Sequence, residues 1–377
     1  RAVGSIATQF RRLSSFRTML LLQFRFGAPL RRGSSPSMLS TKVSAWAALE
    51  AGAPLVPYEF TLDEHPPPGY VDVAIRYCGI CGSDVHQIQD AWGTASFPLV
   101  AGHEIVGDVV AVGDGERRFA VGDRAAIGVQ RSSCGACSYC DSGHENVCRS
   151  ITKTYAGKGK DKGGFASRIR YPSAWVFRTP AGLDGSLVGP LMCAGITTFS
   201  PLKRHAKAGD RVGVVGIGGL GHIALQFGRA MGCEMVAIDT SPAKEDDAKK
   251  FGATTFVSDV ALLQKGSLDM ILNTASGRIP LDPFLELLKP RGSLVCVSLP
   301  DKEERSQLYL HSAVPTERAL VGSYLGPLGD YEEMLNFAVE HNVRPQVEVM
   351  PVERINEAVA RVRAGDARYR VVLEMPS

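Results

Sequence analysis

The stretch between residues 211 and 239 restricts the fold more than any other part of the sequence. It begins with an apolar, β-branched run, RVGVVGIGG, continues as the helix-patterned GLGHIALQFGRAMG, and returns to a strand-like run, EMVAID. Glycines spaced G-x-G-x-x-G allow a tight turn and a close approach to a pyrophosphate, and the following helix directs its positive N-terminus at the phosphates. Asp239 stands 18 residues after Gly221, where a carboxylate can accept hydrogen bonds from a ribose. The pattern predicts a dinucleotide-binding βαβ unit, with candidate contacts at Gly216, Ile217, Gly218, Gly219, Leu220, Gly221 and Asp239.

The alternation of strand and helix patterns continues after this unit. DMILNTAS has the pattern of a strand, a helix is expected through LLKP, and GSLVCVSLP has the pattern of the next strand. Such alternation is typical of a doubly wound parallel sheet. Residues 39–76 instead alternate apolar and polar side chains around Pro and Gly, and residues 104–129 have the pattern of short strands joined by Gly-Asp turns, which suits a small β-rich barrel. The predicted class is therefore α/β, with a β-rich domain beside a doubly wound sheet, and 377 residues are enough for both.

Four cysteines lie close together in a loop rich in Gly and Ser. Cys134, Cys137, Cys140 and Cys148 follow the spacing C-x2-C-x2-C-x7-C, which allows four thiolates to surround one ion tetrahedrally. An iron–sulfur cluster of the bacterial ferredoxin type would have a following Cys-Pro, and disulfides would need an oxidising compartment and a secretory signal. Neither feature is visible, so the spacing predicts a structural zinc ion in a reducing compartment.

A second set of metal ligands is more dispersed. Cys81 lies in CGICGSDVH, His103 lies in a Gly-His-Glu triplet, and Cys193 in LMCAGITTF is the best candidate for a third ligand. A catalytic zinc takes three protein ligands and keeps one position open. Each residue alone could be a buried thiol or a core histidine. Together with the four-cysteine loop and the glycine fingerprint, they predict a catalytic zinc site.

The N-terminal segment, residues 1–38, differs in composition from the rest of the chain. It holds seven of the 42 Lys and Arg residues and no acidic residue, while the remaining 35 basic side chains face 39 acidic ones. An Arg- and Ser-rich, acid-free segment is typical of an organellar transit peptide, although Met38 could equally be the true start and the segment an untranslated leader. We therefore expect a cytoplasmic protein, or a mitochondrial or plastid one if the segment is a transit peptide. The mildly acidic remainder predicts no nucleic-acid partner, and the apolar run at residues 19–22 is too short to span a membrane.

These motifs together resemble the zinc-dependent medium-chain alcohol dehydrogenases, specifically the cinnamyl-alcohol-dehydrogenase-like branch. The resemblance covers nearly all of residues 42–377 and rests on CGICGSD, GHE-x2-G, the four-cysteine loop, LMCAGITTFSPL, GIGGLGH and DARYRVV. It implies a GroES-like catalytic domain formed by residues 39–187 and 323–377, with a Rossmann nucleotide-binding domain at residues 188–322 between them. It also implies a homodimer.

The resemblance assigns roles to individual residues. Cys81, His103 and Cys193 become catalytic zinc ligands, with Glu104 as an alternative ligand beside the metal. Ser83 and His86 match the positions of a proton relay. Further cofactor contacts are expected at Thr197, Thr274, Ser323, Tyr324 and Leu325.

The function implied is hydride transfer between NADP(H) or NAD(H) and a primary alcohol or aldehyde, aromatic or aliphatic, with two zinc ions per chain. Asp239 would repel a 2′-phosphate and so favours NAD. The branch typically uses NADP, however, and Ser241 and Lys244 match positions that hold the phosphate, so NADP(H) is favoured over NAD(H). Lys153 stands where lignin-pathway enzymes usually have tryptophan, which argues against a dedicated lignin precursor as substrate. The alternative is a non-catalytic zinc-binding structural or interaction protein on the same fold.

Overall fold

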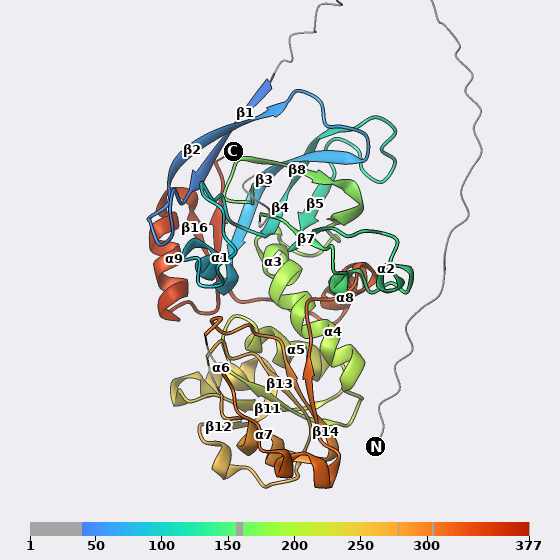
Figure 1. Cartoon of the computed structure of the whole chain (residues 1–377), viewed down its shortest axis with the longest axis vertical. Coiled ribbons are helices and arrows are strands. Elements are labelled where there is room, and N and C mark those ends of the chain that lie inside the picture. Colours follow the sequence, from blue (N-terminus) through green and yellow to red (C-terminus); the bar gives the residue numbers. More distant parts are fainter. Residues whose placement is uncertain (1–39, 156–160, 278, 304, 377) are drawn as a thin grey trace, which may run out of the picture. The chain divides into compact units, whose positions relative to one another are not determined.

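The computed structural model describes residues 40–155, 161–277, 279–303 and 305–376 (Figure 1). The segment that we interpret as a transit peptide or a leader lies outside these residues.

The glycine fingerprint belongs to a parallel sheet. Within the described residues, six strands form it in the order β12-β11-β10-β13-β14-β15. Counted along the chain, this is the 3-2-1-4-5-6 order of dinucleotide-binding folds, whose ligands bind where the order reverses, here between β10 and β13. The strands are β10 (Arg211–Val215), β11 (Glu234–Ile238), β12 (Ala253–Val257), β13 (Leu268–Asn273), β14 (Leu288–Cys296) and β15 (Ala319–Gly322). The connections contain α5 (Gly221–Ala230), η4 (Pro242–Lys244), α6 (Glu245–Lys250), η5 (Val260–Leu262), α7 (Leu281–Leu287), η6 (Leu310–Ser312) and η7 (Val314–Thr316).

Apolar side chains cover both faces of this sheet. Val212 and Val214 of β10 pack into one buried cluster, whereas Val215 packs into another. Alternate residues of a strand point to opposite faces, so the two clusters are the two layers between the sheet and its helices. The near-continuous apolar runs that predicted the doubly wound sheet have this origin.

One predicted helix is shorter than expected. The helix expected through LLKP ends at Leu287, and Leu288 already begins β14 by pairing with Leu268. Pro290 lacks a backbone N–H and disfavours helical geometry at Lys289, which explains why the helix stops there.

The first part of the chain is β-rich, and the end of the chain returns to it. Within the described residues, a seven-stranded sheet has the order β16-β17-β3-β4-β5-β9, with β8 paired to β3. The C-terminal β17 pairs with β3, so Val371 lies opposite Ile80. The strands are β1 (Ser40–Ala47), β2 (Val56–Asp63), β3 (Tyr70–Ile80), β4 (Glu104–Val112), β5 (Arg124–Ile127), β6 (Gln130–Ser132), β7 (Thr152–Lys153), β8 (Arg168–Pro172), β9 (Val176–Arg178), β16 (Val347–Pro351) and β17 (Arg370–Glu374). The associated helices and turns are α1 (Gly82–Ile88), α2 (Ser138–Asp141), η1 (Glu145–Val147), η2 (Ser173–Trp175), α8 (Leu328–Glu340), η8 (Val352–Arg354) and α9 (Ile355–Ala364).

A long helix connects the two sheets. It consists of α3 (Gly185–Pro190), a π-helical turn, η3 (Leu191–Gly195), and α4 (Ile196–His205), which follow one another directly (Figure 1). α3 contacts β3 and β4, whereas α4 contacts α5 and β13. Within the described part of the chain, this helix of 21 residues is long and apolar enough to cross a membrane, but 89% of its apolar 18-residue stretch is buried inside the protein. Its apolar character is therefore that of a core helix.

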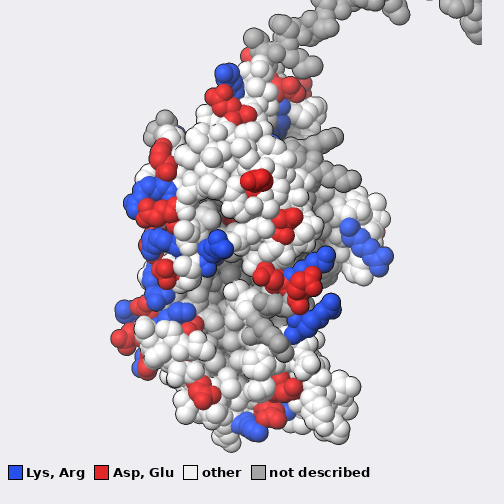
Figure 2. Space-filling model, turned by 60° about the vertical axis from the view of Figure 1, so that its left-hand side comes forward, with Lys and Arg blue, Asp and Glu red and all other residues white. Residues whose placement is uncertain are grey.

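Charged side chains are mixed on the face drawn in Figure 2. Lys and Arg lie beside Asp and Glu there rather than in a separate patch. Ion pairs among the described residues include Arg361 with Glu348, at 2.6 Å, and Arg211 with Glu234, at 2.9 Å. Charge of one sign is thus not concentrated on this face.

Candidate functional site

The dispersed metal ligands predicted from the sequence lie together in the structure. The ligand atoms of Cys81, His103, Glu104 and Cys193 are all within 4.8 Å of one another, and all four residues are buried. Cys81 precedes α1, His103 directly precedes β4, Glu104 begins β4, and Cys193 is in the π-helical turn. The sulfurs of Cys81 and Cys193 are 3.8 Å apart, and Nε2 of His103 is 3.3 Å from the Cys193 sulfur. Three chain segments therefore form one compact set of donors.

The π-helical turn gives Cys193 its orientation. A π turn inserts an extra residue into an α-helix, and such turns are frequent at functional sites. Gly189, one turn before Cys193, makes the close approach to β4 possible, because a Cβ atom there would lie 2.7 Å from the carbonyl oxygen of Glu104. The helix can thus bring a sulfur into contact with ligands at the start of the neighbouring strand.

Asp84, which we did not predict as a site residue, orients this set. Its fully buried carboxylate accepts hydrogen bonds from the backbone N–H groups of Cys81, at 2.8 Å, and Gly102, at 2.9 Å, and from the Tyr155 hydroxyl, at 2.6 Å. Its Oδ1 is also 3.0 Å from Nδ1 of His103. Burial lowers the pKa of His103, but Asp84 outweighs this effect and holds it well above its usual range. With Asp84 as the acceptor for the proton on Nδ1, Nε2 faces Cys193 and is the atom that would bind a metal after releasing its own proton, the common arrangement for a ligand histidine.

Glu104 and Arg370 form a second buried pair beside the ligands. Nη2 of Arg370 donates to Oε1 of Glu104, and both side chains are at most 4% exposed. Burial raises the pKa of Glu104 to about 7, although Arg370 opposes this rise. The other oxygen, Oε2, has no hydrogen-bond partner among the described residues. Gly79 leaves room for this oxygen, because a Cβ atom there would lie 2.1 Å from it.

The chemistry of this donor set suits zinc. The hydrogen bond between the two cysteines lowers the pKa of Cys81 well below its usual value and raises that of Cys193. Thiolate sulfurs and a neutral histidine Nε2 are ligands that zinc prefers, and their protons are released when the metal binds. The unpaired oxygen of Glu104 supplies a further donor. The residues therefore fit a catalytic zinc ion.

The two predicted relay residues lie beside this set. Ser83 Oγ is 3.6 Å from the Cys81 sulfur, and both Ser83 and His86 line the cavity described below. The His86 ring stacks on Trp92, with ring centroids 5.0 Å apart, and its Nδ1 is 3.0 Å from Oδ1 of Asp301. Asp301 follows β14, so this contact joins α1 to the parallel-sheet region.

A single cavity connects the metal ligands to the glycine fingerprint. Its volume is about 790 Å³, and it is lined by Cys81, His103 and Cys193 on one side and by Gly216 and Asp239 on the other. Thr197, Lys244, Thr274, Tyr324 and Leu325 also line it. The fingerprint therefore faces the same space as the metal ligands, at the carboxyl ends of β10 and β11.

The glycines of the fingerprint each meet a distinct requirement of a dinucleotide site. Gly216 has φ +85°, a left-handed conformation that makes the tight turn. A Cβ atom on Gly218 would meet no other atom within 4 Å. Glycine there leaves open space beside the turn, which lets a ligand approach the backbone. A Cβ atom on Gly221 would lie 2.1 Å from the Gly216 carbonyl oxygen, so glycine is needed for close helix–strand packing. These are the three glycine roles of a pyrophosphate-binding turn.

The predicted cofactor residues do not all reach the cavity. Gly219 and Leu220 line it, whereas Ile217 and Gly221 are not among the lining residues. Thr274 lines it and donates to the Gly216 carbonyl oxygen at 2.7 Å. Ser241 and Ser323 are not among the lining residues. Ser241 contacts Asp239 through its backbone N–H, and the Ser323 hydroxyl accepts a hydrogen bond from Arg204 at 2.9 Å.

Asp239 is engaged by its neighbours. Its Oδ2 accepts from the Ile217 N–H at 2.7 Å and from Lys244 Nζ at 2.9 Å, and its Oδ1 accepts from the Ser241 N–H at 2.9 Å. Lys244 therefore balances the charge of the carboxylate at the position expected for the ribose.

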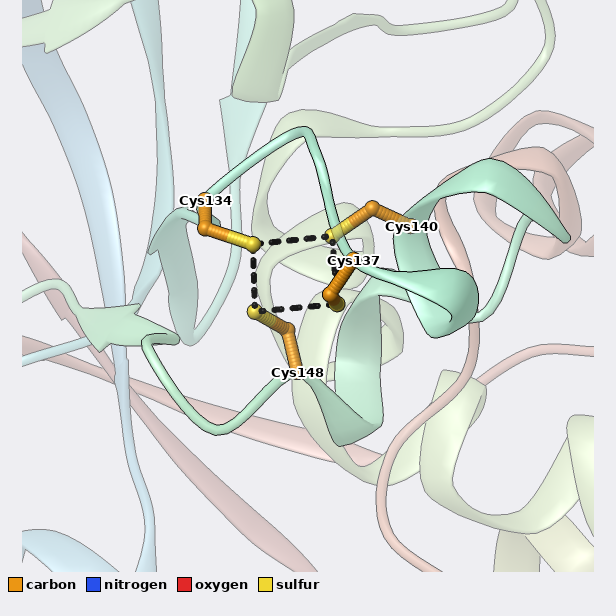
Figure 3. Close-up of side chains that lie close together, drawn as sticks. All are labelled: Cys134, Cys137, Cys140 and Cys148. Atoms are coloured by element: carbon orange, nitrogen blue, oxygen red, sulfur yellow. Dashed lines mark hydrogen bonds between the residues drawn. The ribbon is translucent and has the colours of Figure 1, made fainter. Parts of the chain in front are cut away.

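The four-cysteine loop forms a separate cluster. Figure 3 shows the four sulfurs facing one another in a closed ring of contacts. Their distances are 3.5 Å for Cys134–Cys148, 3.6 Å for Cys137–Cys140, and 3.9 Å for both Cys134–Cys140 and Cys137–Cys148. Zn–S bonds of about 2.3 Å in a tetrahedron place sulfurs about 3.8 Å apart, whereas a disulfide bond is about 2.05 Å. The loop fits a structural zinc ion and contains no disulfide.

Comparison with known proteins places the chain in a family. Residues 67–181 match the family described as "Alcohol dehydrogenase GroES-like domain", and residues 219–340 match the family described as "Zinc-binding dehydrogenase". The aldehyde reductase YahK of Escherichia coli is 39% identical over 88% of this chain and 98% of its own length. A probable mannitol dehydrogenase of Fragaria ananassa is 38% identical over 89% of this chain and 95% of its own. The chain belongs to the zinc-binding alcohol dehydrogenases.

Solved structures of this alcohol dehydrogenase family agree with the fold. The sorghum cinnamyl alcohol dehydrogenase SbCAD4 has a TM-score of 0.85 and 36% identity, covering 89% of this chain and 98% of that one. A cinnamyl alcohol dehydrogenase from Helicobacter pylori complexed with NADP(H) has a TM-score of 0.84 and 30% identity, covering 89% and 99%. The predictions of a GroES-like domain with a Rossmann domain, and of an NAD(P)-dependent alcohol dehydrogenase, are confirmed.

Proposed function

We propose that this alcohol dehydrogenase binds two zinc ions per chain and interconverts primary alcohols and aldehydes with NADP(H). The observation that carries the proposal is the cavity that joins Cys81, His103 and Cys193 to the glycine fingerprint. Reactive ends of a substrate and a dinucleotide can meet there without crossing solvent. The names of its relatives, including aldehyde reductase and mannitol dehydrogenase, support alcohols and aldehydes as the substrate class.

The chain's own residues hold and position the reacting groups. Cys81, His103 and Cys193 would hold zinc, and Glu104 offers an additional oxygen. When bound, zinc supplies a Lewis acid for the substrate oxygen, and the nicotinamide cofactor supplies the hydride. Asp84 keeps His103 oriented. The guanidinium of Arg370 lies beside the fingerprint, since a Cβ atom on Gly219 would be 2.7 Å from its Nη1, and can contact a pyrophosphate there.

A proton must travel between the substrate oxygen and solvent. Ser83 lies beside the metal ligands, so its hydroxyl can exchange a proton with the substrate oxygen. His86 also lines the cavity, has a side chain that is 24% exposed, and can pass the proton to water. The His86 ring stacks on Trp92, and the Asp301 carboxylate lies 3.0 Å from its Nδ1.

Zinc analysis and aldehyde reduction test this function together. We expect two zinc ions per chain and NADPH-dependent reduction of small aromatic and aliphatic aldehydes. One zinc ion per chain, or no reduction of any aldehyde by protein that carries two, would contradict the proposal.

The choice of NADP(H) depends on Lys244. Its ammonium lies at the cavity beside Asp239 and can turn to a 2′-phosphate. A hydrogen bond to a charged group contributes about 1.5–3 kcal/mol, so we expect kcat/KM with NADPH to exceed that with NADH by about tenfold or more. K244Q should remove this preference, whereas K250Q, which changes a lysine paired with Asp247 away from the cavity, should keep it. A preference for NADH in the unaltered enzyme would instead make Asp239 the deciding residue.

A homodimer is also part of the proposal. β15 is at the edge of the parallel sheet, and the exposed Leu320 on it lies close in sequence to the exposed Leu310 and Val314. An exposed strand edge with apolar side chains suits pairing with a second copy. Light scattering should give twice the mass of one chain, and L320K should shift the mass toward one chain. A wild-type mass of one chain at micromolar concentration would contradict a dimer.

A further inference from the structure

One charged side chain that lines the cavity, that of Lys153, has no charged partner among the described residues. Lys153 ends β7 and lines the cavity, and among the described residues it has no ion pair or hydrogen bond from its ammonium group. Its ammonium group lies over the ring of Tyr324, with Nζ 5.9 Å from the ring centroid. An ammonium withdrawn from water without a counter-ion is unfavourable, and burial lowers the pKa of Lys153.

Lys153 lies at the metal-ligand end of the cavity. Two residues further along the chain, the Tyr155 hydroxyl donates to Asp84 and lies 3.3 Å from Nδ1 of His103. Tyr324 lines the same cavity as Cys81, His103 and Cys193. Because Lys153 lies over the ring of Tyr324 and is two residues from Tyr155, it borders the space that a substrate would occupy.

The other cations that line the cavity are accounted for. Lys244 pairs with Asp239 and Arg370 pairs with Glu104, while Arg368 is exposed and lies over the ring of Tyr369. The acidic residues lining the cavity are Asp239 and Asp259, which follow strands β11 and β12 of the parallel sheet. At the metal-ligand end of the described cavity, the charge of Lys153 is therefore not balanced by a lining carboxylate.

We propose that Lys153 binds a carboxylate on the substrate, so that the enzyme prefers aldehydes and alcohols that carry an anionic group over neutral ones of the same size. The inference rests on the proposed function, since it assigns the substrate class of the same site. The aldehyde end of such a substrate faces Cys81, His103 and Cys193, and its carboxylate accepts hydrogen bonds from the ammonium group. The reaction itself is unchanged: the aldehyde carbon receives a hydride from NADPH, and its oxygen receives a proton.

Two para-substituted benzaldehydes, one with and one without a carboxylate, test the proposal. We would measure kcat/KM with NADPH for 4-carboxybenzaldehyde and 4-methylbenzaldehyde, using enzyme that contains its zinc. The readout is the ratio of the two values, because a general change in the fold or in the metal site cancels from it. A hydrogen bond to a charged group contributes about 1.5–3 kcal/mol, so the ratio should be about 10–100 in favour of the carboxylate.

The variants separate recognition from packing. K153Q and K153M should bring the ratio close to one, and K153R, which keeps the charge, should restore a preference for the carboxylate. K42Q removes an exposed lysine that pairs with Glu59 outside the cavity, and it should keep the wild-type ratio. A ratio that is the same in K153Q as in the wild type would overturn the proposal and leave Lys153 with only its contact to Tyr324.

A binding measurement is independent of turnover. 4-Carbamoylbenzoate and 4-methylbenzamide have an inert amide in place of the aldehyde, and their dissociation constants can be measured by calorimetry on enzyme that contains zinc and NADPH. K153Q should weaken binding of 4-carbamoylbenzoate by about tenfold more than binding of 4-methylbenzamide, because only the carboxylate loses a charged hydrogen bond. Equal weakening would count against carboxylate recognition. Reduction of 4-methylbenzaldehyde without any preference for the carboxylate would overturn this inference alone, whereas reduction of neither aldehyde would contradict the proposed function.

Discussion

The two clusters of metal ligands contain similar donors in contrasting surroundings. The four-cysteine loop spans residues 134–148 and includes an exposed residue, Cys134, whereas the set of Cys81, His103, Glu104 and Cys193 is buried and spans 112 residues between its two cysteines. The loop holds its sulfurs by local turns. The buried set exists only when α1, β4 and the π-helical turn have packed together.

Their electrostatic surroundings differ as well. In the loop, the cysteines contact one another and Ser133, and the hydrogen bond with Ser133 lowers the pKa of Cys140 to about 6. The buried set is surrounded by Asp84, Tyr155 and the Glu104–Arg370 pair. A structural ion needs a stable geometry, whereas a reacting site also needs fixed charges and defined proton positions.

The largest expected effect is the loss of a buried ligand. Cys193→Ala should remove one zinc ion of two and lower kcat/KM by about a thousandfold or more, since a metal Lewis acid contributes several kcal/mol to the barrier. Metal analysis and steady-state kinetics measure both changes. Cys296→Ala, at a cysteine on β14 outside both clusters, is the control and should keep two zinc ions. A fully active variant with one zinc ion would mean that the buried set is not the reacting site.

A hydroxyl beside each cluster allows a matched comparison. Ser83 lies 3.6 Å from the Cys81 sulfur, and Ser133 lies 3.4 Å from the Cys140 sulfur. Ser83→Ala should lower kcat by about a hundredfold without changing the zinc content. Of the two serines, only Ser83 lines the cavity, where its hydroxyl can carry a proton. Ser133→Ala should leave kcat at the wild-type value. Loss of zinc in the Ser83 variant would show a structural rather than a proton-transfer role.

Removing the carboxylate beside the buried ligands should weaken zinc binding more than removing the one beside the four-cysteine loop. Asp84→Asn should weaken binding of one zinc ion by about 10–100-fold, because it removes the acceptor that orients His103. Asp141→Asn, on α2 of the four-cysteine loop, should leave both zinc affinities unchanged. Competition with a chelator measures the affinities. Equal zinc affinity in the Asp84 variant and the wild type would mean that backbone packing alone orients the histidine.

The smallest expected effect on activity is at the loop. Cys137→Ser should release one zinc ion and lower the melting temperature by about 5 °C, since each kcal/mol lost shifts it by roughly 2–4 °C in a large domain. At low temperature, kcat/KM should change far less than in Cys193→Ala. Calorimetry and kinetics on the same preparation make the comparison. A thousandfold loss of activity in the Cys137 variant would erase the functional difference between the clusters.

The sequence predicted the local features of this molecule better than the assembled ones. The spacing of the four cysteines is enough to indicate a tetrahedral cluster, and the glycine fingerprint lies on the strand, turn and helix that it predicts. Cys193, by contrast, was only the best candidate for a third ligand until the family resemblance was considered. The position of Cys193 depends on how its helix packs against β4, and no local sequence pattern specifies that packing.

Three residues beside the metal ligands were missed for related reasons. Asp84 has one local signal, since it is three residues after Cys81 and accepts from its backbone N–H, as in a capping box. Tyr155 and Arg370 have none, because one follows the short strand β7 and the other begins the C-terminal strand β17. Ser241 and Ser323 were predicted to contact the cofactor, yet neither lines the cavity, because side-chain direction within a turn depends on the surrounding packing.

The π-helical turn at Leu191–Gly195 has a consequence for how this gene can change. The turn contains one residue more than an α-helix needs, so deleting a residue there would restore ordinary helical pitch and leave the two halves of the helix in almost the same relative orientation. The helix would still connect the two sheets, but the wide turn that carries Cys193 would be lost, and the sulfur would move away from Cys81 and His103. A single-codon deletion in this segment would therefore remove a metal ligand while preserving the packing of α3 and α4. The number of residues in the turn constrains the site rather than the fold.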